Sequence, residues 1–290
     1  MRIGLALGGG VVRGLAHVGV LSVLEREGIP IHCVAGTSAG AIIGSMYAAG
    51  VSVARIRETS LAIKWWHLAR PVFPIRGWVT FAPLERWLVR LLGDMDIRDL
   101  KLPFAAVATD LEAGQPYVMR EGRLAPAVRG SCSVPGVVTP LHYNGRLLCD
   151  GGVSDNLPVS VARSLGADYV IGVNLFDPFF PRPRNLISIS FAAVETLVRR
   201  AGGGVDSADC LIRPDLVGAT YIRFSKKLDL IARGEIATEA MLPTIREAIE
   251  TAAEADLPPH AAQRGLGHAG TATPSPRRKG EPEKPPVWRG

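Results

Sequence analysis

Two units of strand, tight turn and helix follow one another in the first fifty residues, and this order constrains the fold more than any other feature. RIGLAL is a short apolar segment that predicts a strand, and the glycine-rich GGGVVRG after it predicts a turn. Leu15, Val18, Leu21 and Leu24 then recur at three-residue intervals, as on one face of a helix. IHCVAG and AGAIIGSMYAAG repeat the strand and the helix. This alternation predicts an α/β fold, in which a mostly parallel central sheet lies between two layers of helices.

The segment from Ile31 to Ala54 contains no charged residue and is longer than the roughly 20 residues that cross a membrane. It is rich in Gly, Ala and Ser and poor in Leu and Phe, and such residues contribute little to membrane insertion. We therefore predict a buried strand, turn and helix here rather than a membrane span.

The middle of the chain interrupts the alternation, which then resumes. Residues 61–88 hold four of the five tryptophans among Lys and Arg, and several prolines exclude one long helix. PFAAVATDL and QPYVMR predict strands, and HYNGRLLCDGG predicts a hairpin with Asn144 and Gly145 in a tight turn. RLAPAVRGSCSVPG predicts a short helix that runs into a loop, LPVSVARSLG a helix, ADYVIGVNL a buried strand and DCLIRPDL a last strand. Further helices are predicted at about 187–200 and from Leu228 to about 255.

The net charge of +6 lies mostly in the last residues of the chain. From His260 onward there are six Lys or Arg and two Glu, so four of the six net positive charges belong to this segment. The rest is nearly neutral, and without a basic face we predict no nucleic-acid partner. Residues 256–290 contain few large apolar side chains, which predicts a disordered Pro- and Arg-rich tail.

The four cysteines are far apart and form no metal-ligand spacing. A chain of this size needs no disulfides, so free thiols in a reducing compartment are expected. MRIGLALGGG lacks the features of a signal peptide, and the expected location is cytoplasmic.

The sequence GTSAG, Gly36 to Gly40, lies between the second predicted strand and the second predicted helix. GxSxG in this position is typical of a nucleophile elbow, where a strained turn exposes the serine hydroxyl above the sheet. Ser38 is then a candidate nucleophile, and Gly36 and Gly40 allow the close contact of strand and helix. The alternative is a small-residue patch that serves packing alone.

A nucleophilic serine needs a base, and none of the six histidines is well placed. The α/β-hydrolase order puts the histidine late in the chain, but the late His260 and His268 fall in the predicted disordered tail. The histidine-dependent architecture therefore fits poorly.

The loop from Gly8 to Gly14 has two interpretations. Its exposed N–H groups at a helix N-terminus suit either the phosphates of a dinucleotide or the oxyanion of an acyl-transfer reaction. A dinucleotide site also needs an acidic residue at the end of the second strand, where this chain has GTSAG instead. The oxyanion interpretation is favoured.

Four blocks together resemble the patatin-like phospholipase family: LGGGVVRGLAHVGVL, GTSAG, RGSCSVPGVVTPL and LLCDGGVSDNLPV. The motifs cover about residues 1–176, within an expected hydrolase domain of residues 1–255 that ends in a helical extension of about 177–255. The resemblance implies a serine hydrolase with a Ser–Asp dyad and no histidine, acting on carboxylic esters of fatty-acyl lipids through an acyl-enzyme, without metal or cofactor. One block departs from the family, since Gly130 replaces the usual alanine of ASxxxP.

The same resemblance assigns roles to individual residues. Ser38 matches the nucleophile and Asp150 the general base, and Gly151 and Gly152 leave room for Asp150 beside the serine. The expected oxyanion-hole segment consists of Gly8, Gly9, Gly10, Arg13 and Gly14, with the N–H groups of Gly9 and Gly10 as donors and Arg13 holding the loop.

The tryptophan-rich segment has two interpretations that the residues leave open. Trp65, Trp66 and Trp78 either cover the acyl pocket and touch a membrane surface, or pack outer helices onto the core. Two other functions also remain: a regulatory or binding protein on the same fold, and the nucleotide-binding domain. The head group, the acyl length and the oligomeric state are not encoded in any recognisable pattern.

Overall fold

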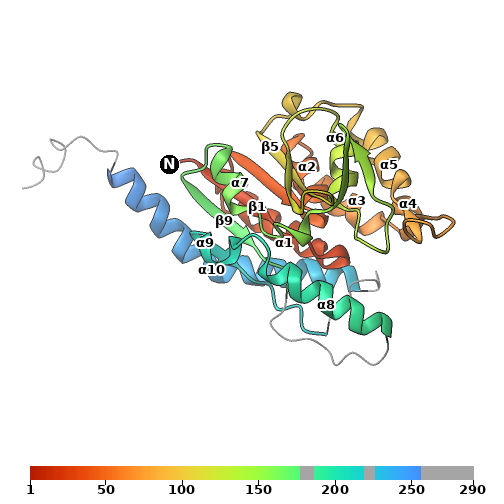
Figure 1. Ribbon diagram of the computed structural model, residues 1–290. Helices are drawn as coiled ribbons and strands as arrows, with labels where there is room; N and C mark the ends of the chain where they lie inside the picture. Colours follow the sequence, from red (N-terminus) through yellow and green to blue (C-terminus); the bar gives the residue numbers. More distant parts are fainter. Residues whose placement is uncertain (177–185, 219–225, 256–290) are drawn as a thin grey trace, which may run out of the picture.

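The computed structural model describes residues 1–176, 186–218 and 226–255, and a single eight-stranded sheet runs through them (Figure 1). The strands lie in the order β10 (Cys210–Ile212), β9 (Tyr169–Val173), β1 (Ile3–Leu7), β2 (Cys33–Thr37), β5 (Phe104–Asp110), β8 (Arg146–Asp150) and β7 (Leu141–Tyr143), with β6 (Gln115–Met119) also paired to β5. The strands from β10 to β5 are parallel, whereas β6, β8 and β7 join antiparallel. The predicted mostly parallel sheet is confirmed.

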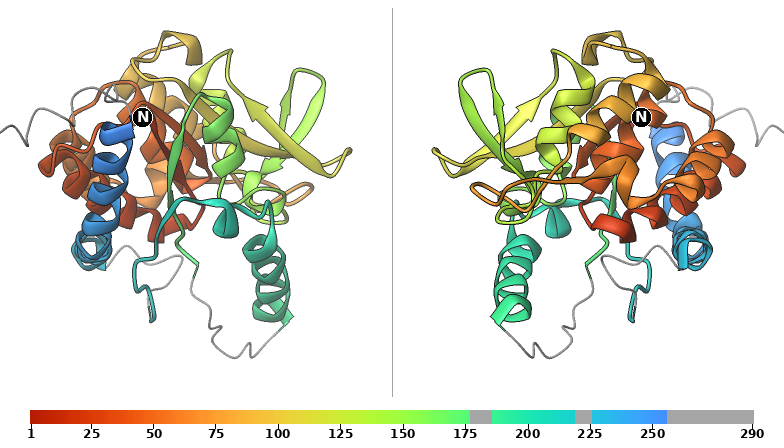
Figure 2. Two further views of the ribbon diagram at one scale, coloured as in Figure 1. Left: turned by 90° about the vertical axis from the view of Figure 1, so that its left-hand side faces the viewer. Right: turned by 90° about the vertical axis from the view of Figure 1, so that its right-hand side faces the viewer.

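Helices connect the strands and cover both faces of the sheet (Figures 1 and 2). They are α1 (Leu15–Arg26), α2 (Ala39–Ala48), α3 (Val53–Ala62), α4 (Trp65–Leu68), α5 (Ala82–Leu92), α6 (Leu124–Ser131), α7 (Val159–Ser164), α8 (Leu186–Arg200), α9 (Gly204–Ser207) and α10 (Lys227–Ala255), with the 3-10 turns η1 (Val11–Gly14), η2 (Ile97–Asp99) and η3 (Gly151–Val153). A separate hairpin of β3 (Arg70–Pro71) and β4 (Val79–Thr80) projects between α4 and α5.

The buried side chains divide into two clusters, one on each face of the sheet. Along β1, Leu5 and Leu7 belong to the larger cluster, which includes side chains of α1, α2 and α10, while Ala6 between them belongs to the smaller one. The smaller cluster packs under α7. This alternation follows from the two-residue period of a strand. Each fully buried Leu contributes about 1.5–3 kcal/mol to stability.

Helix α10 crosses α1 at very close range, and the two helices lie side by side in Figure 2. A Cβ atom on Gly19 would lie 2.0 Å from the Ile231 carbonyl oxygen, and one on Gly234 would lie 2.1 Å from the Ala16 carbonyl oxygen. Only glycine allows this crossing, so α10 packs directly against α1.

The predicted elements agree with the structure within a few residues at each end. The hairpin of β7 and β8 turns at Asn144 and Gly145, with φ of 48° and 75°, as the dipeptide predicts. The segment from Ile31 to Ala54 forms β2, α2 and the start of α3. No pattern was recognised for α3. The predicted disorder of residues 256–290 lies outside the described residues.

Candidate active site

Ser38 occupies the turn between β2 and α2 with φ 52° and ψ −120°. Positive φ is uncommon for a residue other than glycine and costs about 1–3 kcal/mol. The surroundings hold this conformation: the Ser38 N–H donates to Ser131 Oγ at 2.8 Å, and Ser131 Oγ donates to the Val107 carbonyl at 2.6 Å. The Ser38 carbonyl accepts the first two hydrogen bonds of α2, from Ala41 and Ile42. Strand β5 and helix α6 thus fix the serine in its strained turn.

Glycines around Ser38 allow strand and helix to approach closely. A Cβ atom on Gly40 would lie 2.0 Å from the Leu7 carbonyl oxygen, and one on Gly36 would lie 2.6 Å from the Gly40 carbonyl oxygen. On the other side, a Cβ atom on Gly14 would lie 2.5 Å from the Ala39 Cβ. The small residues therefore pack the core and, through that packing, place Ser38 at the end of β2.

Asp150 ends β8, and its carboxyl group lies close enough to the Ser38 side chain for that side chain to act on the pKa of the carboxyl. Its carboxylate accepts the Gly152 N–H at 2.8 Å. Two bonds fix its backbone: its N–H donates to the Ser133 carbonyl at 2.9 Å, and its carbonyl accepts Thr109 Oγ1 at 2.9 Å. Only 7% of the residue is exposed. The antiparallel pairing of β8 with β5 therefore brings together two residues 112 positions apart.

Burial changes the proton affinity of this carboxyl group. Desolvation raises the pKa of Asp150 to about 6, although the Ser38 side chain and the hydrogen bond from the Gly152 N–H act to lower it. Asp150 is thus ionised at neutral pH but binds a proton more readily than an ordinary aspartate. A carboxylate of this kind suits general base catalysis.

Gly151 and Cys132 complete the surroundings of the pair. A Cβ atom on Gly151 would lie 2.1 Å from the Val107 carbonyl oxygen, so a glycine is required where β8 turns away from β5. Burial and, to a smaller extent, the charge of Asp150 raise the pKa of the Cys132 thiol well above the usual value, although the Ser38 side chain acts to lower it. Cys132 is therefore a neutral thiol at physiological pH. All four cysteines are free and buried.

The peptide unit between Gly8 and Gly9 is bound at both of its polar groups. The Gly8 carbonyl accepts His17 Nε2 at 2.8 Å, and the Gly9 N–H donates to Asn156, at 3.2 Å to Oδ1 and 3.4 Å to the carbonyl. The Gly8 N–H donates to the Val173 carbonyl at 3.1 Å. Both N–H groups thus donate within the protein, and the predicted role of the Gly9 N–H as an oxyanion donor stays a prediction.

The next two N–H groups along the loop, unlike those of Gly8 and Gly9, are available to a substrate. The N–H groups of Gly10 and Val11 have no hydrogen-bond partner within residues 1–176, 186–218 and 226–255. Val11, with φ 52°, is a second non-glycine residue of positive φ in the site, and it lines the same pocket as Ser38. Arg13 holds the turn, because its N–H donates to the Gly10 carbonyl at 3.0 Å and Nη1 donates to the Leu175 carbonyl at 3.5 Å.

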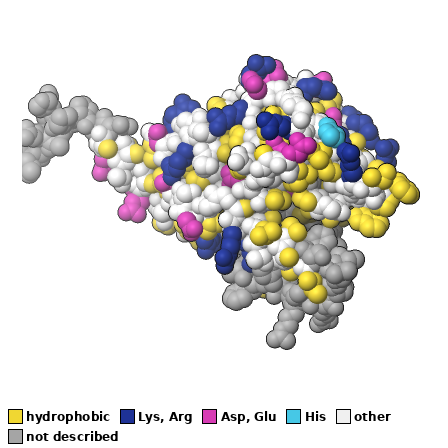
Figure 3. Space-filling model, in the orientation of Figure 1, with side chains coloured by type: hydrophobic (Ala, Val, Ile, Leu, Met, Phe, Trp, Pro, Cys, Tyr) yellow, Lys and Arg dark blue, Asp and Glu magenta, His cyan; other side chains and the backbone are white. Residues whose placement is uncertain are grey.

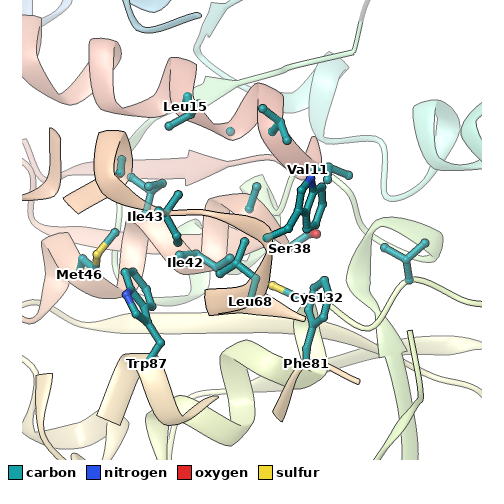
Figure 4. A pocket seen from close by; sticks show the side chains of 17 residues that line it. Val11, Leu15, Ser38, Ile42, Ile43, Met46, Leu68, Phe81, Trp87 and Cys132 are labelled. Carbon is teal, nitrogen blue, oxygen red and sulfur yellow. The ribbon is translucent and has the colours of Figure 1, made fainter. Parts of the chain in front are cut away.

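An apolar pocket of about 90 Å³ opens beside Ser38 (Figure 4), which is well above the roughly 10–15 Å³ that one water needs. Helix α2 contributes Ile42, Ile43 and Met46, and the tryptophan-rich segment contributes the opposite wall. None of the lining residues is charged. The pocket therefore suits an aliphatic chain.

The tryptophans divide between the two predicted roles. Trp65 is half-buried and lines the pocket together with Trp87, whereas Trp66 and Trp78 are 67% and 66% exposed. Trp65 therefore covers the pocket, as the first interpretation predicts, while its membrane contact stays a prediction.

Four functional neighbours were not predicted. Ser131 lies in GSCSVP and Asn156 in SDNLP, blocks whose family resemblance was the available signal, and His17 lies in a predicted helix. Asp155 has one buried carboxylate oxygen without a hydrogen-bond partner in the described part of the chain, and burial raises its pKa to about 7. No pattern in the sequence distinguished it.

The described residues contain no group of three or more His, Cys, Asp or Glu side chains that could hold a metal ion. None of their helices combines the length and the apolar character that crossing a membrane requires.

A family model that spans Ser38 and Asp150 and several named relatives match this chain. A family model described as patatin-like phospholipase matches residues 5–163, more than half of the chain. The chain is 38% identical over 181 residues to "Patatin-like phospholipase domain-containing protein 6" of Homo sapiens and 32% identical over 179 residues to "Lysophospholipase NTE1" of Debaryomyces hansenii. It is also 36% identical over 176 residues to an uncharacterized NTE family protein of Mycobacterium tuberculosis. Each match covers 60% of this chain, but 13%, 12% and 49% of the respective relative.

Among solved structures, VipD from Legionella pneumophila shares the fold, with a TM-score of 0.56 at 14% identity. The match covers 84% of this chain and 67% of VipD.

Proposed function

Because the chain belongs to the patatin-like phospholipase family, we propose that it hydrolyses carboxylic esters of fatty-acyl lipids with Ser38 as nucleophile and Asp150 as base. The observation that carries the proposal is the buried Asp150 carboxyl group beside Ser38, a serine that lines an uncharged pocket. The chain spans about an eighth of the length of the first relatives, so their activities are attributed to it only as part of this proposal.

The reaction proceeds in two halves. Asp150 accepts the proton of the Ser38 hydroxyl as Ser38 Oγ attacks the ester carbonyl carbon. The tetrahedral intermediate then collapses, its bond to the alcohol breaks, and Asp150 returns the proton to the departing alcohol. In the second half Asp150 takes a proton from water, the resulting hydroxide attacks the acyl-enzyme, and the fatty acid leaves as the proton returns to Ser38 Oγ.

The negative charge on the carbonyl oxygen needs hydrogen-bond donors. We assign this role to the N–H groups of Gly10 and Val11, which have no partner in the described residues and lie in the loop held by Arg13. His17 and Asn156 then act as positioning residues, because together they fix the orientation of the preceding peptide unit.

The pocket indicates which part of the substrate it binds. Its uncharged lining favours the acyl chain over a phosphate or another charged head group, whose burial without a partner is unfavourable. A long-chain lipid reaches such a pocket from a lipid surface. We therefore include in the proposal the membrane contact that the exposed Trp66 and Trp78 indicate.

A fluorophosphonate probe tests the nucleophile. The wild type is expected to become labelled, and Ser38→Ala is expected to lose all labelling. Ser60→Ala is the matched control, because Ser60 lines the same pocket, is buried, and has no assigned role. Absence of labelling in the folded wild type, or labelling retained in Ser38→Ala, would contradict the proposal, and the former result would favour a binding protein. A panel of acyl lengths and head groups then defines the substrate.

A further inference from the structure

Four large apolar side chains are exposed along one short segment. Trp66 is 67% exposed, Phe73 84%, Ile75 80% and Trp78 66%, and we call these four residues the apolar tip. Figure 1 shows the β3–β4 hairpin projecting beside α4, and Figure 3 shows hydrophobic side chains gathered at the same end of the molecule. Exposed apolar patches on soluble proteins mark interaction sites.

The hairpin that carries the tip is anchored to the body. Trp78 N–H and Val79 N–H both donate to the Val137 carbonyl, at 2.8 and 3.0 Å, and Thr139 N–H donates to the Val79 carbonyl at 2.9 Å. A Cβ atom on Gly77 would lie 2.7 Å from the Thr139 nitrogen, so the two segments are in tight contact. The exposed side chains therefore extend from a fixed base rather than a loose loop.

The charge around the tip has one sign. Residues 59–84 contain Lys64, Arg70 and Arg76 and no Asp or Glu. All three cations are exposed, and none of the ion pairs formed within the described residues includes them. Lys64 Nζ lies 5.1 Å from the centroid of the Trp66 ring, which joins the basic and aromatic groups on one surface.

The tip is continuous with the wall of the pocket. On α4, Trp66 is exposed, while its neighbours Trp65 and Leu68 line the pocket. Phe81, directly after β4, also lines it. One stretch of chain thus exposes apolar side chains on its outer face and contacts the space beside Ser38 with its inner face.

We propose that the apolar tip and its three cations dock the protein onto an anionic phospholipid bilayer, from which an acyl chain enters the pocket. Aromatic and aliphatic side chains with Lys or Arg at their edge match the boundary between acyl chains and negatively charged head groups. A convex projection with only positive charge fits this boundary better than a groove in another protein. The entry of a substrate chain rests on the proposed function, whereas the docking itself requires no hydrolysis.

Vesicle co-sedimentation of the full chain carrying Ser38→Ala tests the docking without turnover. Vesicles of phosphatidylcholine with phosphatidylglycerol are expected to bind the protein at least tenfold more strongly than phosphatidylcholine alone. Adding Phe73→Ser and Ile75→Ser should reduce binding at least tenfold, and adding Arg70→Glu should remove the preference for the anionic lipid. Leu228→Ser with Ile236→Ser is the matched control, because these α10 side chains are 60% and 65% exposed, and binding should not change.

Ester turnover by the chain that keeps Ser38, with and without Phe73→Ser and Ile75→Ser, provides a second measurement. The tip variant should hydrolyse a short soluble ester at the wild-type rate and a phospholipid in anionic vesicles at least tenfold more slowly. Vesicle binding that is absent in the Ser38→Ala chain, or equal in tip and control variants, would overturn the docking proposal. So would a self-association in solution that the tip substitutions abolish, because the tip would then be a contact between copies. Failure of the proposed function is distinguishable, since it gives vesicle binding without probe labelling or turnover.

Discussion

Replacing Asp150 by Asn is expected to stabilise the protein at neutral pH while removing its activity. Burial raises the pKa of Asp150 from an ordinary 3.8 to about 6, so the folded state binds a proton more tightly than the unfolded chain. The stability that this proton contributes is fully present below pH 3.8 and is lost as the pH rises through 6. Above that value the folded protein carries an unfavourable buried charge.

The magnitude follows from the size of the pKa shift. About two pKa units at 1.36 kcal/mol each correspond to about 3 kcal/mol at pH 7, and the same relation leaves less than about 1 kcal/mol at pH 4. Asn cannot ionise but keeps an oxygen that can accept the Gly152 N–H. The free energy of unfolding of Asp150→Asn should therefore exceed that of the wild type by about 3 kcal/mol at pH 7 and nearly match it at pH 4.

Urea unfolding followed by tryptophan fluorescence at pH 4, 5, 7 and 8 measures this difference. Asp110→Asn is the matched control, because this substitution is expected to change the free energy of unfolding at pH 7 in the opposite direction. Burial acts to raise the pKa of Asp110, but the N–H groups of Ala113 and Glu112 together with Arg146 lower it, so loss of its charge should destabilise the fold at pH 7. A stability gain for Asp150→Asn that is absent at pH 7, or equally large at pH 4, would refute the reasoning.

Three further predictions concern the same site. Because Asp150 must be ionised to act as a base, kcat/KM for a soluble ester should fall about tenfold from pH 7 to pH 5, and a profile that stays flat to pH 5 would exclude it as the base. Ser131→Ala leaves the Ser38 N–H buried without its acceptor and should cost about 1–3 kcal/mol in urea unfolding and lower kcat, whereas Ser45→Ala, at a buried serine outside the pocket lining, should leave kcat unchanged. Since burial raises the pKa of Asp155 to about 7, Asp155→Asn should stabilise the fold at pH 8 and progressively less towards pH 4, and a pH-independent effect would show that its charge is not the cause.

Local patterns were sufficient to predict most elements and to indicate Ser38 as a candidate nucleophile, whereas Asp150 was assigned as the candidate base through the family resemblance. The strands and helices of the first fifty residues follow from their apolar periods, and Ser38 and Asp150 lie in short blocks whose small residues permit close approach. The antiparallel insertion of β8 beside β5 was not predicted, because strand partners depend on packing of the whole sheet.

Of the two oxyanion donors proposed above, the sequence indicated Gly10 but not Val11, for a related reason. The orientation of the Gly8–Gly9 peptide depends on His17 and on Asn156, which is 147 positions away from Gly9. A glycine-rich loop indicates that N–H groups are accessible, but only the contacts across the sheet decide which of them are already used. The same holds for Trp65 and Trp66, which are adjacent in sequence and face different surroundings.

The outer wall of the pocket and the reacting groups belong to different stretches of the chain. Trp65, Leu68, Phe81 and Trp87 lie within the single segment between α3 and η2, whereas Ser38 and Asp150 lie at the ends of β2 and β8. Substitutions in that segment therefore reshape the pocket without touching the proposed catalytic pair. Replacing the segment alone offers a route to a protein with a different pocket and the same strand ends.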